Sequence, residues 1–306
     1  MEQIQVSMAT AFMREQELLR AAKTWLEPRF SEIRALSFGC SIGDELASIK
    51  TLMPDAEIHG ADINRLALEV AERTTGAFAQ VFLSDEAEIA RRGPFQLVCA
   101  FSSLCINPSP PDLPERYPFA RFERVVELFS EVLVPGGVLA LFNTSYLFQH
   151  ASAYGRFDVL RPDHVMRNGW VDVYAPDGAR LLRAKPTPAS YAQVLESADG
   201  IEDDWHLIDS LFVRRDDATA TGREILPLTL YDPLPDQPSS QVAEWERSDL
   251  DSLAPEDHEG YVDFRHTYRI FRTEAGASLL ERDVRRDSVL GGPPITVGPI
   301  GRHPLG

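Results

Sequence analysis

The sequence predicts an α/β fold: a Rossmann-like, doubly wound and mostly parallel sheet with helices on both faces. Two observations in the first half of the chain carry this prediction. Short apolar runs alternate with segments of helical periodicity, which is typical of successive βαβ units. A turn of small residues, 39–43, has glycine at both ends and joins the first of these runs to its helix.

Each predicted element follows from its local pattern. Apolar residues at helical spacing place an amphipathic helix over 11–27, and Pro28 ends it. Pro135-Gly136-Gly137 separates the last helix of the alternating part from its last strand. The same reasoning predicts strands at 33–38, 56–61, 78–83, 95–101 and 138–142, and helices at 44–53, 64–73 and 122–132.

Beyond residue 143 the alternation stops. The turn residues Ala175-Pro176-Asp177-Gly178 predict a hairpin between 171–174 and 180–183. Weaker patterns predict a short helix at 190–197, strands at 205–213 and 261–272, a loop or linker at 215–260, and a disordered end or extended arm at 291–306.

We therefore divide the chain into three parts. Residues 1–29 form an N-terminal helix or lid. Residues 30–215 form the core, including a β-rich insertion at 146–186 that would cover a substrate. Residues 216–306 form a partly irregular extension, for which two roles stay open: it covers the active site, or it pairs with a second copy to make a homodimer.

Composition excludes several classes of protein. Acidic residues outnumber basic ones by 47 to 30 in 306 residues, a net charge of -17, which argues against nucleic-acid partners. The three cysteines form no C-x-x-C pair, and His258 and His266 fit no metal-ligand spacing, so we expect no disulfide scaffold and no metal. We find neither a signal-peptide pattern nor an apolar run of about 20 residues, so we expect a cytoplasmic protein without a membrane partner.

The segment Leu36-Ser37-Phe38-Gly39-Cys40-Ser41-Ile42-Gly43-Asp44-Glu45 carries most of the functional information. Its glycines let a ligand approach the backbone, and the free N–H groups of the following helix favour a negative charge. Asp62 ends the next strand, 23 residues after Gly39, near the interval of about 20 expected for a carboxylate that receives ribose hydroxyls. Together these features predict a site for a nucleoside ligand. The alternative is a tight turn followed by an aspartate that only caps a helix.

The spacing of the glycines bears on which nucleoside binds. Dinucleotide folds use G-x-G-x-x-G, whereas here Ser41 stands between Gly39 and Gly43 in a G-x-x-x-G spacing, which weakens a nicotinamide ligand. The segment resembles motif I of the class I S-adenosylmethionine-dependent methyltransferases, in the G-C-S-x-G-[DE]-E variant of the chemotaxis-receptor carboxyl methyltransferases. The Pro135-Gly136-Gly137 turn is similar to the one that precedes that family's fifth strand.

The resemblance implies S-adenosyl-L-methionine as cofactor and assigns roles to residues. Asp62 matches the ribose-binding acid, and Ser84-Asp85 match the position that contacts the adenine amino group. Many members carry an acid where Ser37 stands and aspartate where Gln96 stands, so the partner of the cofactor's ammonium group stays open between Asp44 and a backbone carbonyl. The implied cofactor-binding residues are Phe38, Gly39, Cys40, Ser41, Gly43, Asp44, Asp62, Ile63, Asn64, Ser84, Asp85, Phe101 and Ser102.

The resemblance implies methyl transfer to oxygen, nitrogen or carbon of a small-molecule acceptor, as found in specialised metabolism. His150 is our first candidate for a general base because the pKa of histidine lies near the working range. Tyr146 is the second. Each candidate has a structural alternative: His150 would be a surface or cap histidine on a loop, and Tyr146 an aromatic packing residue. Further candidates beyond the fourth and fifth strands are Ser102, Ser103, Asn143, Tyr154 and His164.

Two other functions stay open at this level. One is a nicotinamide-dependent oxidoreductase on the same kind of sheet. The other is a non-catalytic nucleoside-binding or assembly protein that uses its C-terminal extension as an interaction arm.

Overall fold

The computed structural model describes most of the chain. The described residues are 10, 12–107, 109–162, 171–184, 195–197, 210–216, 224–228, 238–251, 262–273, 278–288 and 295–305. In 182–184, 195–197 and from 238 onward, the description covers the backbone only.

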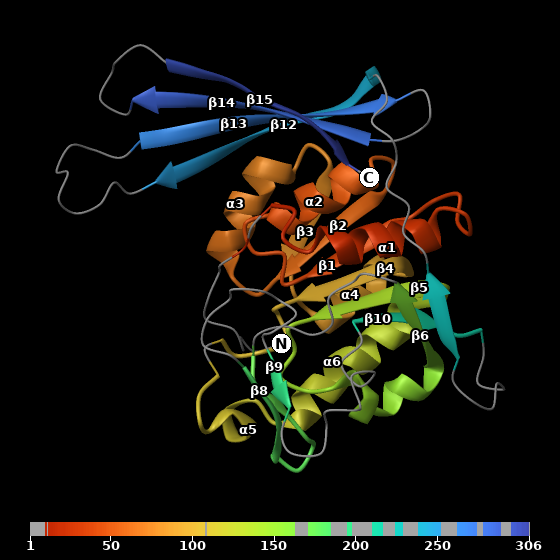
Figure 1. Cartoon of the computed structure of the whole chain (residues 1–306). Coiled ribbons are helices and arrows are strands. Elements are labelled where there is room, and N and C mark those ends of the chain that lie inside the picture. Colours follow the sequence, from red (N-terminus) through yellow and green to blue (C-terminus); the bar gives the residue numbers. More distant parts are fainter. Residues whose placement is uncertain are drawn as a thin grey trace.

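A single eight-stranded sheet forms the centre of the molecule (Figure 1). Its strands, in spatial order, are β11 (Ile225–Leu228), β6 (Phe157–Pro162), β10 (Leu211–Arg214), β5 (Leu133–Phe142), β4 (Phe95–Phe101), β1 (Arg34–Phe38), β2 (Glu57–Asp62) and β3 (Ala79–Leu83). The strands from β3 to β5 are mutually parallel, whereas β10 runs antiparallel to both of its neighbours. The predicted Rossmann-like class is therefore confirmed.

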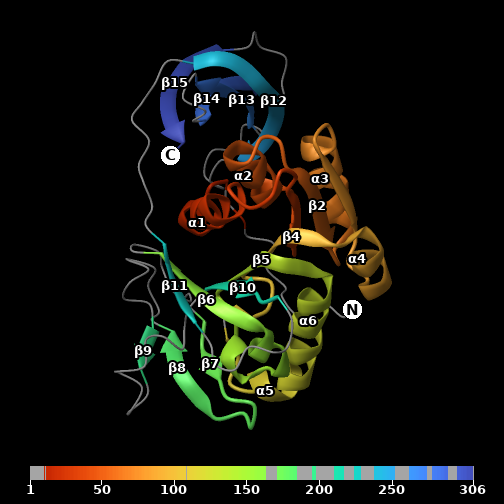
Figure 2. The ribbon, with the colours of Figure 1, turned by 90° about the vertical axis from the view of Figure 1, so that its right-hand side faces the viewer.

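Helices cover both faces of this sheet (Figure 2). One face carries α1 (Gln16–Leu26), α2 (Asp44–Leu52) and α3 (Arg65–Thr75); the other carries α4 (Glu86–Arg92), α5 (Leu113–Arg116) and α6 (Phe119–Val132). Two 3-10 turns, η1 (Phe148–His150) and η2 (Ser152–Arg156), follow β5. Each helical layer closes its own hydrophobic core against the sheet.

Local sequence explains where α1 and α6 lie. Apolar residues three and four positions apart give α6 one buried face, which includes Phe122, Val126 and Phe129. The helix α1 begins at Gln16 and not at residue 11, because Met13 has a φ of 59° that a right-handed helix does not accommodate.

Among the short elements, α4 and β9 differ from the prediction, whereas the hairpin agrees with it. The helix α4 was not predicted; Asp85 starts it by accepting hydrogen bonds from the N–H groups of Ala87 and Glu88. Within 190–197, where we expected a helix, Leu195–Ser197 forms strand β9. The predicted hairpin is confirmed: β7 (Val173–Tyr174) and β8 (Arg180–Ala184) pair antiparallel, and β8 also pairs with β9.

The C-terminal part is more regular than predicted. It forms a four-stranded antiparallel sheet of β12 (Pro238–Asp251), β13 (Val262–Thr273), β14 (Ser278–Ser288) and β15 (Ile295–Leu305). Only β13 was predicted. Strand β12 lies in the segment 215–260, where we expected a loop, and β15 lies in the tail 291–306. Both were missed because pairing with other strands stabilises them, and the local sequence pattern does not show that pairing.

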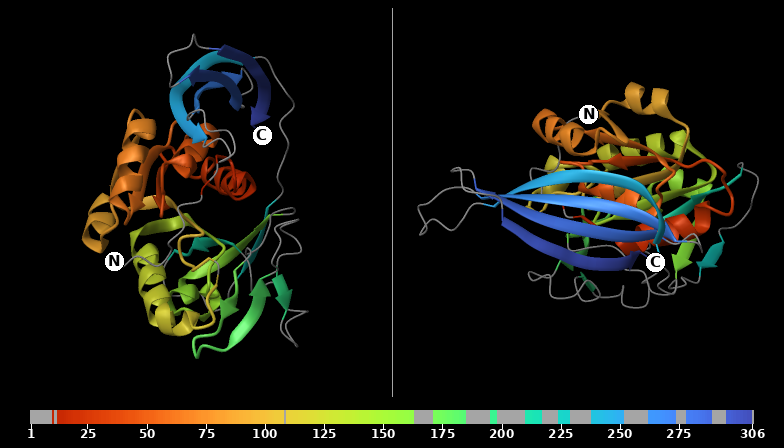
Figure 3. Two further views of the ribbon diagram at one scale, coloured as in Figure 1. Left: turned by 90° about the vertical axis from the view of Figure 1, so that its left-hand side faces the viewer. Right: turned by 90° about the horizontal axis from the view of Figure 1, so that it is seen from above.

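This second sheet lies over α2 and α3 (Figure 3), with contacts from β14 to α2 and from β12 to α3. The central sheet also continues past residue 215, where we expected the core to end. Its last strand, β11, pairs with β6. The part of the chain that belongs to the core therefore reaches Leu228.

Strand β10 tests the packing of the central sheet. Phe212 is fully buried, and its ring centroid lies 4.8 Å from that of Phe148 and 6.0 Å from that of Tyr154. We predict that Phe212→Ala lowers the free energy of unfolding by about 3–5 kcal/mol because it leaves a cavity. Urea denaturation followed by circular dichroism measures this. Ile225→Ala is the control, since that side chain in the same sheet is 55% exposed and should change stability by less than about 1 kcal/mol. Equal losses for the two variants would contradict the packing described.

Candidate functional site

The order of the strands indicates where a ligand enters. The chain runs from β1 outward through β2 to β3, then returns to the other side of β1 with β4 and β5. Loops that follow β1 and β4 therefore leave the sheet in opposite directions. In open α/β sheets such a switch point, at the carboxyl ends of the strands, is where ligands bind.

The loop after β1 is shaped by backbone hydrogen bonds to β2. The N–H groups of Gly39 and Cys40 both donate to the carbonyl of Ala61, over 2.7 and 3.2 Å. Gly39 has a φ of 81°, and a Cβ built on it would lie 2.4 Å from the Cβ of Ser103 in the loop after β4. Glycine is therefore required here both by conformation and by the close approach of the two loops.

Asp62 ties this loop to the end of β2. Its Oδ2 accepts from the N–H of Ser41 and its Oδ1 from the N–H of Asn64, each over 2.8 Å. The cap of α3 is Asn64, whose Oδ1 accepts from the N–H groups of Leu66 and Ala67. Asp62 is therefore not the cap of α3. Each oxygen of the Asp62 carboxylate keeps the capacity to accept a further hydrogen bond.

Unusual backbone conformations concentrate at the same edge. Ser41, Ser102 and Asn143 follow β1, β4 and β5 respectively, and all three have φ between 50° and 59°. The amide of Asn143 donates to Ser102 Oγ over 3.0 Å, which joins the last two loops. Non-glycine residues are held in this region only when the surroundings force it, and such residues cluster at functional sites.

A buried charged cluster, which the sequence did not predict, lies on the α1 and α2 side of this edge. It consists of Arg14, Glu15 and Glu45. The side chain of Glu15 is 4% exposed and that of Glu45 is 9% exposed. Arg14 Nε lies 2.7 Å from Glu15 Oε1. Burial raises the pKa of each glutamate to about 7, while Arg14 acts against the rise in both and Ser37 acts against it in Glu45.

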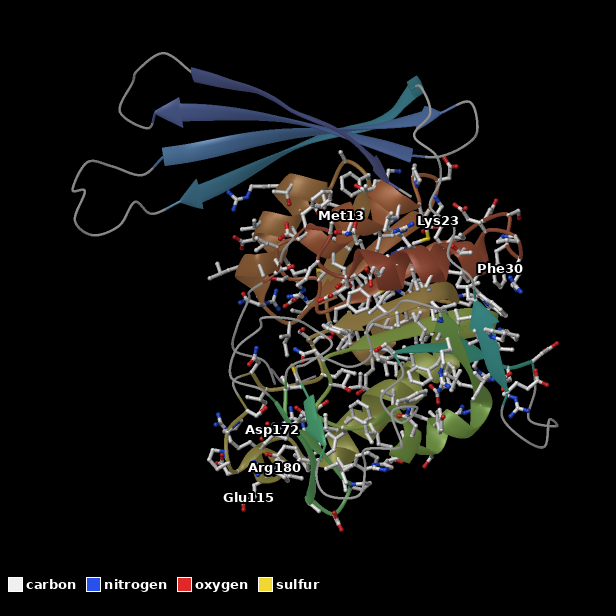
Figure 4. The ribbon with its side chains drawn as sticks, viewed as in Figure 1. Met13, Lys23, Phe30, Glu115, Asp172 and Arg180 are labelled. Carbon is white, nitrogen blue, oxygen red and sulfur yellow. The ribbon has the colours of Figure 1, made fainter. Side chains whose placement is uncertain are left out.

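The cluster lines a recess. The walls include Arg14, Glu15, Leu19, Glu45, Ser48 and Phe101, around a partly open cavity of about 10 Å³, which is the room that one water molecule needs. Met13, which is labelled in Figure 4, belongs to the N-terminal segment. Its N–H donates to Ser48 Oγ over 2.8 Å, which attaches the backbone of this segment to the wall of the recess. The only sequence signal for Glu45 was its position after Asp44 at the helix start; Arg14 and Glu15 gave none.

The other predicted cofactor residues occupy varied surroundings. The ring of Phe38 packs against Phe129 on the opposite face of the sheet, with centroids 5.0 Å apart, so only its backbone faces the loop. Burial raises the pKa of the Cys40 thiol well above its usual range. Asp85 is committed to capping α4, and the preceding Ser84 donates its N–H to the carbonyl of Asp62.

The two candidate bases lie in different environments. Tyr146 is buried, donates its hydroxyl to the carbonyl of Tyr117 over 2.5 Å and has a pKa raised to about 12 by burial. This arrangement favours the packing alternative, because a hydroxyl so placed is a poor proton acceptor at neutral pH. His150 is exposed on η1; burial of its ring lowers the pKa, and Asp177 opposes the shift.

Some candidates cannot be placed. His164 and His258 lie outside the described residues, and His266 lies in β13, where only the backbone is described. Among the side chains that the structure does describe, no group of three or more histidines, cysteines or acids has a geometry that would hold a metal. Within the same described ranges, every helix is too short or too polar to cross a membrane.

Comparison with known proteins gives structural likeness only. No protein-family model matches the chain. No curated protein matches its sequence either. Among solved structures, CalS10, an amino pentose methyltransferase from Micromonospora echinaspora solved with bound SAM, is 13% identical, with a TM-score of 0.35 over 93% of this chain and 75% of its own.

Two further structures match over less than half of the chain. PKMT2 from Rickettsia typhi, solved with AdoHcy, is 15% identical with a TM-score of 0.33, over 44% of this chain and 26% of its own. The N-methyltransferase NodS from Bradyrhizobium japonicum was solved with S-adenosyl-L-homocysteine. It is 17% identical with a TM-score of 0.33, over 42% of this chain and 59% of its own. The chain thus spans less than two thirds of the length of these two proteins.

The contact between the loops after β1 and β4 yields a prediction. Gly39→Ala places a methyl group against Ser103 at a φ that alanine rarely adopts, so we expect a loss of at least about 1 kcal/mol of folding stability. Thermal unfolding measures it. Gly155→Ala is the matched control, because a Cβ there meets nothing within 4 Å. If the two variants melt together, the close approach of the loops is not as described.

Proposed function

We propose that the chain is an S-adenosylmethionine-dependent methyltransferase that acts on oxygen, nitrogen or carbon of a small-molecule acceptor. One observation carries the proposal. Asp62 stands at the carboxyl end of β2, beside a glycine loop at the switch point, and its carboxylate is held by backbone N–H groups with acceptor capacity left over. This is the arrangement that receives the hydroxyls of a ribose.

The residues present fit this cofactor. Glycine at position 39 lets the loop after β1 pass against Ser103, so the two loops that flank the switch point lie close together. No side chain among the described residues caps α2, which begins at Asp44 directly after the glycine loop, and the start of a helix favours a negatively charged group. The cofactor would supply a methyl group bonded to a sulfonium, and the protein would supply alignment and exclusion of water.

The proton acceptor is the least defined part of the proposal. We retain His150, because a lowered pKa keeps its imidazole neutral and able to accept a proton at pH 7. Tyr146 stays the second candidate and is the less favoured one, because its hydroxyl is buried, donates to the carbonyl of Tyr117 and has a raised pKa. An acceptor whose reacting atom carries no proton at neutral pH would need no base.

The two alternatives are less well supported. A nicotinamide-dependent oxidoreductase on the usual dinucleotide fold has six parallel strands, whereas here β10 is antiparallel between β5 and β6. A non-catalytic nucleoside-binding protein would share the Asp62 arrangement. Transfer of a labelled methyl group to any acceptor, in a screen of small molecules, would separate it from an enzyme.

A homodimer is part of the proposal. In the C-terminal sheet, β12 and β15 are edge strands, and edge strands present unpaired backbone groups to other chains. We expect light scattering of the full chain to give twice the mass of 34.2 kDa. A monomer at all accessible concentrations would remove this element and leave the catalytic proposal intact.

Asp62 provides the direct test of the cofactor assignment. We predict that Asp62→Ala weakens S-adenosylhomocysteine binding by about 10- to 100-fold, because it removes a charged hydrogen-bond acceptor. Isothermal titration calorimetry measures the change. Asp62→Asn, which keeps the shape and one acceptor oxygen, should give a smaller loss, and the exposed Asp55→Ala is the control. Folded wild-type protein that binds no S-adenosylhomocysteine would refute the proposal.

A further inference from the structure

Two buried glutamates share one cation where the segment before α1 packs against α2. Glu15 and Glu45 are both buried, and Arg14 Nε lies 2.7 Å from Glu15 Oε1. Glu15 Oε2 and Glu45 Oε1 accept no hydrogen bond from the residues that the structure describes. If both glutamates were ionised, one cation would face two carboxylates, and a net buried negative charge is costly.

The surroundings of the pair do not offset this charge. The recess has room for about one water molecule, and Leu19 and Phe101 form apolar parts of its wall. Glu45 also acts on the thiols of Cys40 and Cys99, which are neutral because burial raises the pKa of each well above its usual range. Within the described part of the chain, Arg14 is the one cation that acts on either glutamate.

Protonation removes the conflict. Burial raises the pKa of both glutamates to about 7; the charge of Glu15 adds to the rise in Glu45, while Arg14 and the Ser37 hydroxyl oppose it. A protonated carboxyl group is neutral and can donate a hydrogen bond. A glutamate in water has a pKa of about 4.3. The packed segment therefore binds protons that a released segment gives up.

The segment 12–15 is attached beside these glutamates by its backbone. Met13 N–H donates to Ser48 Oγ, and Ser48 Oγ donates to the carbonyl of Asp44 over 2.7 Å. Met13 has a φ of 59°, which costs free energy for a non-glycine residue. Contacts with α2 must outweigh that cost, and charging the glutamates acts against the same contacts.

We propose that the segment 12–15 is a pH-sensitive strap, packed against α2 while Glu15 and Glu45 are protonated and released when both are ionised. Arg14 compensates one carboxylate, so the second charge drives the release. Phe101 ends β4 and lines the same recess, so release uncovers the edge of the sheet where the loops after β1 and β4 diverge. The inference goes beyond the proposed function, because it holds for any ligand that enters at that edge.

The direction of the pH dependence follows from linkage. A carboxyl group whose pKa is raised in the packed state stabilises that state fully below about pH 4, and the contribution is lost as the pH rises to about 7. For one such group the ratio of released to packed segment rises about 20-fold between pH 5.5 and 7.5. Two groups give a larger change in the same direction.

Hydrogen exchange of the full chain measures the release. The N–H groups of Met13 and Leu19 donate to Ser48 Oγ and to the carbonyl of Glu15. After correction for the intrinsic exchange rate, we expect their protection to fall at least about 10-fold between pH 5.5 and 7.5. Helix α6, on the other face of the sheet, is the internal control and should keep its protection. An unchanged protection at Met13, or an equal fall in α6, would overturn the proposal.

Variants assign the pH dependence to the two glutamates. Glu15→Gln combined with Glu45→Gln removes both ionisable groups and keeps their shape, so protection at Met13 should change less than about twofold over the same range. Glu131→Gln makes the same chemical change at an exposed position of α6 and should keep the wild-type pH dependence. A wild-type pH dependence in the double variant would refute the strap. If the double variant does not fold, the comparison of Met13 with α6 in the wild type decides.

Discussion

The site depends on the hydrogen bonds that join the loop after β1 to the end of β2. Ala61 offers its carbonyl to two consecutive N–H groups, and Asp62 offers its carboxylate to a third, that of Ser41. These bonds fix the loop in a conformation that forces Gly39 against Ser103. The loops after β1, β2 and β4 are therefore held against one another by direct contacts.

Local patterns predicted the central part of the fold well. Strand β4 was predicted with its observed bounds, and α2 and β3 within one residue at each end, because buried parallel strands read as short apolar runs between helices. Strands β12 and β15 were missed for a physical reason. Their sequences are polar or rich in proline and glycine, and what stabilises them is pairing with strands that lie elsewhere in the chain.

The same division holds for the site. Gly39 and Asp62 could be predicted because their roles follow from position along one βαβ unit. The cluster of Arg14, Glu15 and Glu45 could not, because it forms only where the start of α1 packs against α2. Tyr146 shows the opposite relation between position and surroundings. Its position after β5 predicted a catalytic role, whereas its side chain packs against the rings of Tyr117 and Phe122 and donates to a backbone carbonyl, as a packing residue does.

The carboxylate of Glu45 on α2 is held in place differently from an acid at the position of Ser37 on β1. A strand residue at the position of Ser37 would be fixed by the sheet, whereas Glu45 reaches the same region from a helix and shares its environment with Glu15 and Arg14 from the N-terminal segment. Because the charges of these three groups are coupled, ionising Glu45 is most favourable when Arg14 is close and Glu15 is neutral. The charge state of the cluster and the packing of the N-terminal segment against α2 are thus linked, because Arg14 and Glu15 come from that segment and Glu45 from the helix.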